Sequence, residues 1–414
     1  MQQEKRLVPQ LRFPEFDGEW EKKKLGDVAK VTSGGTPNRS KNQYWGGDLP
    51  WLTTSLIDFN LITKAEEFIT NEGLENSSAK LFPVGTLLMA MYGQGKTRGK
   101  IGVLGIKAST NQACGAIVPS KTIKNYFLFQ NLAGRYDEIR NLSNDGGQQN
   151  ISLGIIKSLK FAHPSLPEQQ KIADFLSAVD TRIQSLEKKK SLLKIYKKGV
   201  MQKIFTQEIR FRDDTSTPLS ASNGQEFPEW EKKKLGDILI EVNDKSTISN
   251  QYPILSSTAK GLFNQSDYFK KDVASKDNTG YKILKKHQLV LSPQNLWLGN
   301  INVNCDFAIG AVSPSYKVFD FNKNLTSFEF CKYLLFTNRM FYEYSQASEQ
   351  GASIVRRNLD MLSFVAIPIK LPTPKEQAKI ANFLSVLDKR IGLVTEQIEK
   401  TKTYKKGLLQ QMFV

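Results

Sequence analysis

The chain has 414 residues, 40% of them hydrophobic and 24% charged, so it is long enough for about two to four domains with ordinary cores and is not intrinsically disordered. With 58 Lys and Arg against 41 Asp and Glu, the net charge is +17, which indicates a polyanionic partner, nucleic acid first and an anionic membrane surface second. The N-terminus is polar and no run of about 18 apolar residues is present, so we expect neither a secretory signal nor a transmembrane helix.

Cysteine and histidine are scarce. Cys114, Cys305 and Cys331 are too far apart in the chain for a disulfide framework or a zinc spacing, and they fit a reduced cytosol. His163 and His287 are the two histidines, so chemistry that needs several imidazoles is disfavoured. We therefore expect no metal site.

The first feature in chain order is a repeated block. Residues 20–27 read WEKKKLGD, and the same eight residues recur at 230–237. Just upstream, residues 11–13 (LRF) have a counterpart at 209–211 (IRF). A repeat over about half the chain length predicts two copies of one architecture.

Each copy continues into a region of mixed secondary structure. Residues 85–91 and 288–291 read as buried strands, whereas 126–140 and 328–343 have helical patterns. Short runs bounded by Gly, Asn, Pro and Ser separate them. The pattern predicts an α+β fold.

One segment of the first copy satisfies a loose Walker A pattern. Residues 90–97 read AMYGQGKT and follow a strand. A nucleotide site needs a helix after the Lys-Thr pair, whose N-terminus receives the phosphates. The chain instead continues RGKIGV, which predicts a second strand, and the matching segment 293–299 has no Gly-Lys-Thr. We interpret this basic loop as a DNA contact.

Polar segments of both copies are candidates for DNA contacts, because Lys and Arg suit phosphates or guanine and Gln and Asn suit adenine. For any single residue, a solvated position or a phosphate contact is the commoner outcome. The candidates in the first copy are Arg39, Lys41, Tyr44, Thr53, Thr54, Ser55, Tyr92, Gln94, Lys96, Arg98, Lys100, Gln148, Gln149 and Asn150. Those in the second copy are Ser256, Ser257, Thr258, Lys260, Gln294, Asn295, Trp297, Asn300, Arg356, Arg357 and Asn358.

Each copy ends in a long helix. Residues 171–205 and 379–413 are identical at 16 of 35 positions, and apolar residues recur at alternating steps of three and four. This spacing over four to five heptads is typical of a coiled coil. The coiled-coil positions are Ile172, Leu176, Val179, Ile183, Leu186, Leu193, Val200 and Ile204 in the first helix, and Ile380, Leu384, Leu387, Ile391, Val394, Ile398, Leu408 and Met412 in the second.

Polar residues interrupt both apolar stripes, namely Lys190 and Lys197 in the first and Thr401 and Lys405 in the second. Two such helices in one chain most simply pack on each other in antiparallel orientation; packing against other chains is the alternative. Membrane binding is disfavoured because the stripes are narrow and have few aromatic anchors.

Motifs for catalysis are missing. The chain has no Pro-Pro and hence no amino-methyltransferase motif, and its two His are not near a Gly-x-Ser-x-Gly elbow. Glu-x-Lys triplets occur, but a lysine-rich chain contains them by chance. We expect no catalytic residues. Two alternatives stay open: a stand-alone nuclease or methyltransferase with an unrecognised active site, and a coiled-coil scaffold without a nucleic-acid role.

Across essentially its whole length the chain resembles the specificity subunits of type I restriction–modification systems. A Pro, Glu and Gln signature precedes each long helix, with a different spacing at the proline in the two copies. The matching segments are 11–14 (LRFP), 18–20 (GEW), 25–27 (LGD), 47–52 (GDLPWL), 164–172 (PSLPEQQKI), 227–230 (FPEW) and 371–377 (LPTPKEQ).

The resemblance implies two repeated target-recognition domains joined by two long helices in an antiparallel coiled coil, with pseudo-twofold symmetry. The expected segments are a first target-recognition domain with an N-terminal arm (1–165), a first spacer helix (166–206), a linker (207–228), a second target-recognition domain (229–371) and a second spacer helix (372–414).

The resemblance also implies a non-catalytic, cytoplasmic subunit. Each target-recognition domain reads one half of a bipartite sequence in double-stranded DNA. Two adenine methyltransferase (modification) subunits and translocating nuclease (restriction) subunits are the expected partners. S-adenosylmethionine, ATP and Mg are expected on those partners, and no cofactor on this chain.

Overall fold

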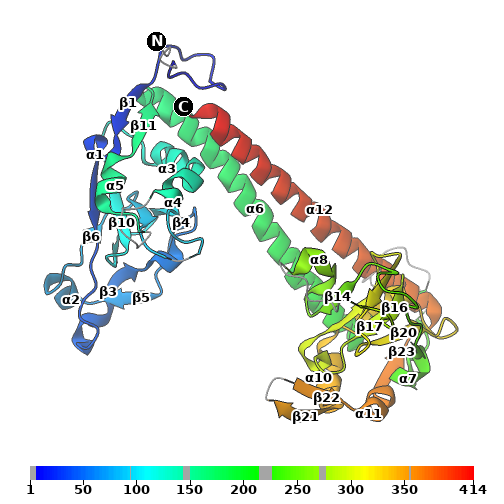
Figure 1. Cartoon of the computed structure of the whole chain (residues 1–414). Coiled ribbons are helices and arrows are strands. Elements are labelled where there is room, and N and C mark those ends of the chain that lie inside the picture. The colour runs from blue at the N-terminus through cyan, green and yellow to red at the C-terminus, as the bar shows by residue number, and fades with distance from the viewer. Residues whose placement is uncertain (1–5, 94, 143–149, 214–225, 270–276, 354–355) are drawn as a thin grey trace. The chain divides into compact units, whose positions relative to one another are not determined.

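The computed structural model describes residues 6–93, 95–142, 150–213, 226–269, 277–353 and 356–414. They form two compact units (Figure 1). The first unit contains Met1–Lys188 and Thr395–Val414, and the second contains Lys189–Val394. The two long helices, α6 (Leu166–Phe205) and α12 (Pro374–Met412), therefore each contribute one part to each unit.

The first unit contains a five-stranded sheet in the order β2-β10-β7-β8-β4 and a four-stranded sheet in the order β5-β3-β9-β6. Strands β7 and β8 are buried throughout, as their continuous apolar sequences predict. The bounds are β1 (Glu21–Lys24), α1 (Leu25–Val28), β2 (Ala29–Ser33), β3 (Trp45–Leu52), β4 (Leu61–Ile62), β5 (Glu67–Ile69), α2 (Asn71–Glu75), β6 (Leu81–Phe82), β7 (Leu87–Ala90), β8 (Ile101–Leu104), β9 (Ala108–Thr110), β10 (Cys114–Pro119), α3 (Asn125–Gly134), α4 (Tyr136–Asn141), α5 (Leu153–Ser158) and β11 (Lys160–His163).

The second unit contains a four-stranded sheet in the order β13-β20-β17-β18 and four two-stranded ladders, β12-β23, β14-β15, β16-β19 and β21-β22. The bounds are β12 (Glu231–Lys234), α7 (Leu235–Ile238), β13 (Leu239–Val242), β14 (Leu255–Thr258), β15 (Gly261–Asn264), α8 (Gln265–Tyr268), β16 (Lys282–Lys285), β17 (Leu289–Leu291), β18 (Ile301–Val303), β19 (Ile309–Val312), β20 (Lys317–Phe321), α9 (Phe328–Leu334), α10 (Asn338–Gln346), β21 (Ser348–Ser353), β22 (Arg356–Leu359), α11 (Met361–Ala366) and β23 (Pro368–Leu371).

Mixed helix and sheet in both units confirms the predicted α+β class. Each helical pattern in the globular parts is, however, two helices. The pattern at 126–140 divides into α3 and α4 at Arg135, and the pattern at 328–343 divides into α9 and α10. In the second case the Thr337 side chain accepts a hydrogen bond from the backbone N–H of Met340 and thereby caps a new helix.

The repeated block at 20–27 and 230–237 forms the same substructure twice. Its lysines lie on β1 and β12, which pair antiparallel with β11 and β23. The following leucines, Leu25 and Leu235, are fully buried. A Cβ on Gly26 would come within 3.1 Å of the Lys157 side chain, and one on Gly236 within 3.0 Å of the Val365 side chain. Close backbone approach therefore explains why glycine follows leucine in both copies.

Each long helix begins with a buried carboxylate. Arg12 Nε and Nη2 donate to the two oxygens of Glu168, both at 2.8 Å, and Trp20 Nε1 donates to Oε1 at 3.3 Å. In the second unit Arg210 and Trp230 donate to Glu376 in the same way, at 2.8 to 3.2 Å. The repeated Arg and Trp therefore fasten the chain before each globular part to the start of its long helix.

The glutamine of each helix-start signature is buried as well. Gln169 Nε2 donates to the carbonyl of Pro164 at 2.9 Å, and its Oε1 accepts from the backbone N–H of Lys124. Gln377 Nε2 donates to the carbonyl of Pro372 at 3.0 Å, and its Oε1 accepts from Thr326 Oγ1. The Pro, Glu and Gln signature is thus a structural joint between each long helix and its globular part.

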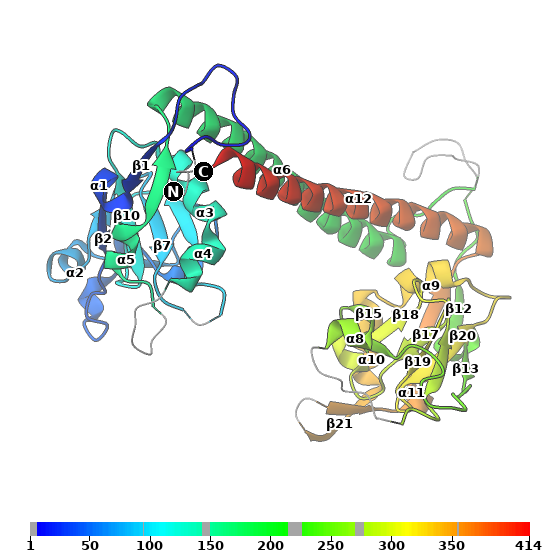
Figure 2. The same cartoon turned by 45° about the horizontal axis from the view of Figure 1, so that its top comes forward.

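Helices α6 and α12 lie side by side, as Figures 1 and 2 show. In the first unit Lys402 pairs with Glu187 at 2.7 Å and Lys405 pairs with Asp180 at 2.6 Å. The partner numbers fall on α6 as they rise on α12, so the pairing is antiparallel, as predicted. No helix in the described part of the chain is both long enough and apolar enough to cross a bilayer.

All sixteen predicted coiled-coil residues are buried or half-buried. The apolar stripes do more than pair the helices, however. Ile172 and Leu176 belong to the core of the first unit together with Leu408 and Met412 of α12. Ile380 and Leu384 pack in the same way with Val200 and Ile204 in the second unit. The hydrophobic core of each globular part therefore includes residues from the start of one long helix and from the end of the other.

Candidate nucleic-acid interface

Arg39 lies in the loop between β2 and β3 and is contacted by residues of β3 and β5. Its guanidinium carbon lies 3.7 Å from the centroid of the Trp45 ring, and Nη1 donates to Glu67 Oε2 at 2.6 Å. Lys41 is exposed and donates to the hydroxyl of Tyr44, which is itself buried. Of these three candidates, Arg39 and Lys41 present charge to solvent.

The basic loop between β7 and β8 is a turn, and no helix follows Thr97. This confirms that the segment does not have the architecture of a Walker A site. Arg140 Nη2 donates to the carbonyl of Gly95, and the Tyr136 hydroxyl donates to the carbonyl of Lys96 at 2.7 Å. Two side chains of α4 therefore hold the backbone of this turn.

The candidate side chains of this turn differ in exposure. Tyr92 and Lys96 are exposed. Lys100 forms an ion pair with Asp58 at 2.6 Å, and Arg98 is buried. Gln94 lies outside the described residues. Lys96 is thus an exposed cation of this turn and presents its charge to solvent.

The other candidates of the first unit lie in a short turn and a longer loop. Thr53 and Thr54 are half-buried, Ser55 is exposed, and the hydroxyls of Thr53 and Ser55 are 2.7 Å apart. Asn150 is half-buried. Gln148 and Gln149 lie outside the described residues.

Three candidates of the second unit lie in the interior. Ser256, Ser257 and Asn300 are each less than 9% exposed. Ser257 Oγ donates to Asn300 Oδ1 at 2.7 Å and accepts from Asn302 Nδ2 at 2.8 Å. Ser257 and Asn300 therefore satisfy each other, and Ser256 Oγ accepts from Gln265 Nε2 at 3.3 Å. These three groups offer little surface to DNA. Thr258 is half-buried, and Lys260 at the end of the hairpin is exposed.

Among the remaining candidates of the second unit, Arg357 contacts Gln294 and Trp297. The backbone N–H of Arg357 donates to the carbonyl of Gln294, and the Arg357 guanidinium carbon lies 4.9 Å from the centroid of the Trp297 ring. Arg357 Nη1 also donates to Ser345. Gln294 and Asn358 are exposed and Asn295 is half-buried, whereas the side chain of Arg356 lies outside the description.

Sequence reasoning missed the residues that hold these candidates. Glu67 anchors Arg39 from another strand, and Tyr136 and Arg140 hold the basic turn from α4. No local pattern marks them, because their partners lie 28 to 45 residues away in the chain. The antiparallel register of β3 and β5, which sets Trp51 opposite Glu67, is what places the carboxylate there.

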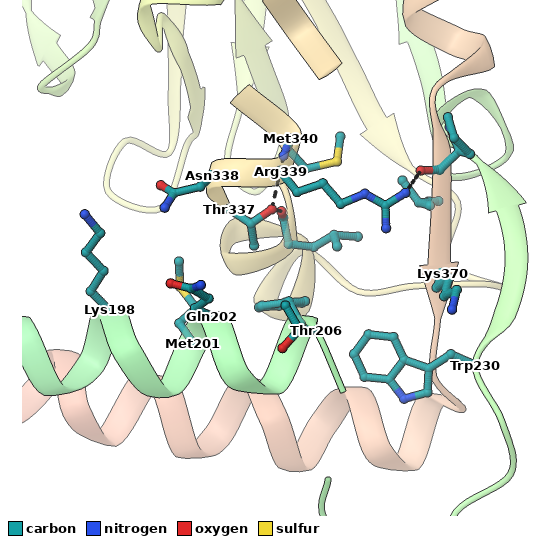
Figure 3. Close-up of a pocket in the computed structure, with 14 residues that line it drawn as sticks. Lys198, Met201, Gln202, Thr206, Trp230, Thr337, Asn338, Arg339, Met340 and Lys370 are labelled. Atoms are coloured by element: carbon teal, nitrogen blue, oxygen red, sulfur yellow. Dashed lines mark hydrogen bonds between the residues drawn. The ribbon is translucent and has the colours of Figure 1, made fainter. Parts of the chain in front are cut away.

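A pocket of about 190 Å³ in the second unit is lined by none of these candidates (Figure 3). It is mostly apolar, and the Arg339 side chain at its edge donates to the carbonyl of Pro368 at 3.2 Å. In the first unit Arg135 donates to the carbonyl of Lys160 in the same manner. The residues around the pocket are Lys198, Met201, Gln202, Phe205, Thr206, Trp230, Leu334, Thr337, Asn338, Arg339, Met340, Pro368, Ile369 and Lys370.

Family and fold comparisons agree with this geometry. The model of the type I restriction modification DNA specificity domain matches residues 17–194 and, a second time, residues 228–403. The two matches cover most of the chain, so the chain belongs to this family.

Two curated relatives and one solved structure illustrate the likeness. The MjaIX specificity subunit of Methanocaldococcus jannaschii is 29% identical over 231 residues, which are 53% of this chain and 52% of the relative, so the match spans about half of each. The putative MjaX specificity subunit of the same organism is 25% identical over 410 residues, 94% of this chain and 92% of the relative. The S subunit from M. genitalium, a crystal structure, has a TM-score of 0.54 at 15% identity over 98% of this chain and 99% of that one, and shows the same fold.

Proposed function

We propose that the chain is the DNA-specificity subunit of a type I restriction–modification complex. Each compact unit reads one half of a bipartite target in double-stranded DNA. The observation that carries this proposal is the duplication: the DNA specificity domain occurs twice, and each copy has its own α+β unit and its own helix-start joint. The net charge of +17 supports a polyanionic ligand.

The partners follow from the same proposal. This chain acts in the cytoplasm with adenine methyltransferase subunits and restriction subunits. Because the chain is duplicated, we expect two methyltransferase subunits. The partner subunits supply the catalytic groups and bind S-adenosylmethionine, ATP and Mg. This chain binds and positions DNA and is not itself a catalyst. A stand-alone nuclease or methyltransferase is the competing function, and methyl transfer to DNA by the purified chain alone would favour it.

Replacement of one unit tests the proposal. Residues 30–160 are exchanged for those of another such protein, and the methylated motif is mapped in cells that contain the methyltransferase partner. One half of the motif should change and the other half should persist, because the second unit is untouched. Exchange of residues 240–366 is the matched control and should change the other half. If either exchange altered both halves, the units would not be independent readers.

A further inference from the structure

Arg39 is exposed and yet contacted on two sides. Its side chain is 54% exposed, but the guanidinium carbon lies 3.7 Å from the centroid of Trp45 and 4.9 Å from that of Trp51. One nitrogen, Nη1, donates to Glu67 at 2.6 Å. A long charged side chain on a surface usually samples many rotamers, so a fixed one requires an explanation.

The platform under Arg39 is itself rigid. The rings of Trp45 and Trp51 meet edge to face, with centroids 5.1 Å apart. Trp45 Nε1 donates to the carbonyl of Asn38 at 3.2 Å, and Trp51 Nε1 donates to the carbonyl of Gly35 at 3.0 Å. Both indoles lie on β3 and are hydrogen-bonded to the loop that contains Arg39. The orientation of the guanidinium plane is therefore set before any ligand binds.

The free part of the guanidinium suits a base better than a phosphate. Among the described residues, Glu67 is the hydrogen-bond partner of this group, so Nε and Nη2 keep their donors. The planar fork of an arginine also fits a phosphate, but the Glu67 carboxylate paired with Arg39 repels an anion and does not repel a neutral base. A guanine base presents O6 and N7 to two parallel N–H donors, and this contact depends on the plane of the arginine.

We propose that Arg39 is a specificity-determining residue that reads a guanine, with two N–H donors directed at O6 and N7, in the half of the target recognised by the first unit. The inference rests on the proposed function. Lys41, two residues along the same loop, is the natural comparison: its single ammonium carries charge without a fixed plane, and it serves as a phosphate contact.

The test uses the full chain with its methyltransferase partner. Motifs are mapped for the wild type and for Arg39→Lys, Arg39→Ala, Lys41→Ala and Arg357→Lys. Both Arg39 variants should lose the guanine preference at one position of one half-site, and discrimination at that position should fall on the order of 10- to 100-fold in competition binding with the other three bases. The other half-site should not change. Arg39→Lys is decisive, because it keeps the charge and removes the planar pair of donors.

The controls separate the possible outcomes. Lys41→Ala should weaken binding to all sequences about equally, and Arg357→Lys should leave the first half-site as it is. An unchanged motif in Arg39→Lys would overturn the proposal, as would a uniform loss of affinity or a first half-site without any G·C pair. If Arg39→Ala fails to fold, Arg39→Lys decides alone. A wild-type motif that is not bipartite would refute the proposed function itself, and a bipartite motif insensitive to Arg39 would refute this inference alone.

Discussion

Glu168 and Glu376 show how single residues determine the frame of this molecule. Both carboxylates are almost completely buried, at 2% and 0% exposure, at the start of a long helix. A buried carboxylate is costly unless it is paired and hydrogen-bonded, and each has an arginine and an indole N–H as donors. Removal of the arginine alone leaves the charge buried without its partner.

Arg12→Ala should therefore lower the free energy of unfolding of the first unit by about 3 kcal/mol. Arg210→Ala should have the same effect on the second unit. Chemical denaturation, with hydrogen exchange to assign the affected unit, measures both. Arg6→Ala is the control, because the Arg6–Glu19 pair is exposed and such pairs contribute about 0 to 1 kcal/mol. Equal effects of Arg12→Ala and Arg6→Ala would contradict the structural role given to Arg12.

Because two cysteine thiols are buried, we expect the free energy of unfolding to fall at alkaline pH. Burial raises the pKa of Cys114 to about 12, from an ordinary value of 9.0. The unfolded chain then loses the thiol proton above about pH 9 while the folded chain keeps it. Cys114 therefore stabilises the fold below pH 9, and this contribution declines as the pH rises from 9 to about 12, by about 1.4 kcal/mol per pH unit.

Cys114→Ala tests this sign. The variant should show a shallower fall of unfolding free energy between pH 9 and 11, whatever its stability at pH 7. Burial also raises the pKa of Cys331 to about 12, so Cys331→Ala should make the fall of the unfolding free energy shallower in the same way. Cys305 is half-buried, and Cys305→Ala should change the slope less. A slope in Cys114→Ala identical to that of the wild type would show that this thiol does not titrate on unfolding.

At the scale of elements, one aspartate in each unit joins three segments. Asp180 on α6 accepts from Tyr126 and Gln130 of α3 and pairs with Lys405 of α12 at 2.6 Å. In the second unit Asp388 on α12 accepts from Tyr333 of α9 at 2.9 Å and pairs with Lys197 of α6 at 2.5 Å. Lys197 and Lys405, two of the lysines that interrupt the apolar stripes, are thus half-buried ion-pair partners where α6 and α12 pack together, which we call the helix seam.

Asp180→Ala should loosen the helix pairing in the first unit. Lys405 and the Tyr126 hydroxyl would both lose their partner in a largely buried place, at a cost of about 2 to 3 kcal/mol. Hydrogen exchange should speed up in residues 395–412 and not in residues 374–394, which belong to the second unit. Glu187→Ala is the matched control, since its pair with Lys402 is about half exposed. Equal exchange rates in the two variants would refute the seam role of Asp180.

At the scale of the whole molecule, each long helix has residues in both units, with the boundaries after Lys188 and after Val394. Under the proposed function, the helix length sets the number of unread base pairs between the half-sites. An α-helix rises ~1.5 Å per residue, so one heptad adds ~10 Å. DNA rises ~3.4 Å per base pair along one strand, so ~10 Å corresponds to about three base pairs.

Insertion of one heptad at both boundaries should therefore lengthen the spacer of the methylated motif by about three base pairs, less what DNA bending absorbs. The two half-site sequences should stay as they are, because the residues that read them are untouched. Insertion into α6 alone is the control and should disrupt the seam, since one helix then shifts against the other. An active complex with both insertions and an unchanged spacer would show that the helices do not measure the gap.

The sequence by itself determined the duplication, the two long antiparallel helices and the strand after Thr97. Those features depend on local signals: identical blocks, a 3.5-residue apolar spacing, and Gly and β-branched residues where a nucleotide site needs a helix. The same signals predicted one helix where α3 and α4 are separate, because a continuous apolar pattern does not show where a backbone turn interrupts it.

The tertiary structure alone decided what individual polar side chains do. Ser257 and Asn300 look like loop residues available to DNA, and they are buried partners of each other. Arg39 looks like one basic residue among several, and Glu67 and two indoles give it a fixed plane. Glu168 looks like part of a family signature, and it is the buried partner of Arg12. In each case the hydrogen-bond partner is 28 to 156 residues away, where no local pattern can point to it, although the indoles beside Arg39 are close to it in the sequence.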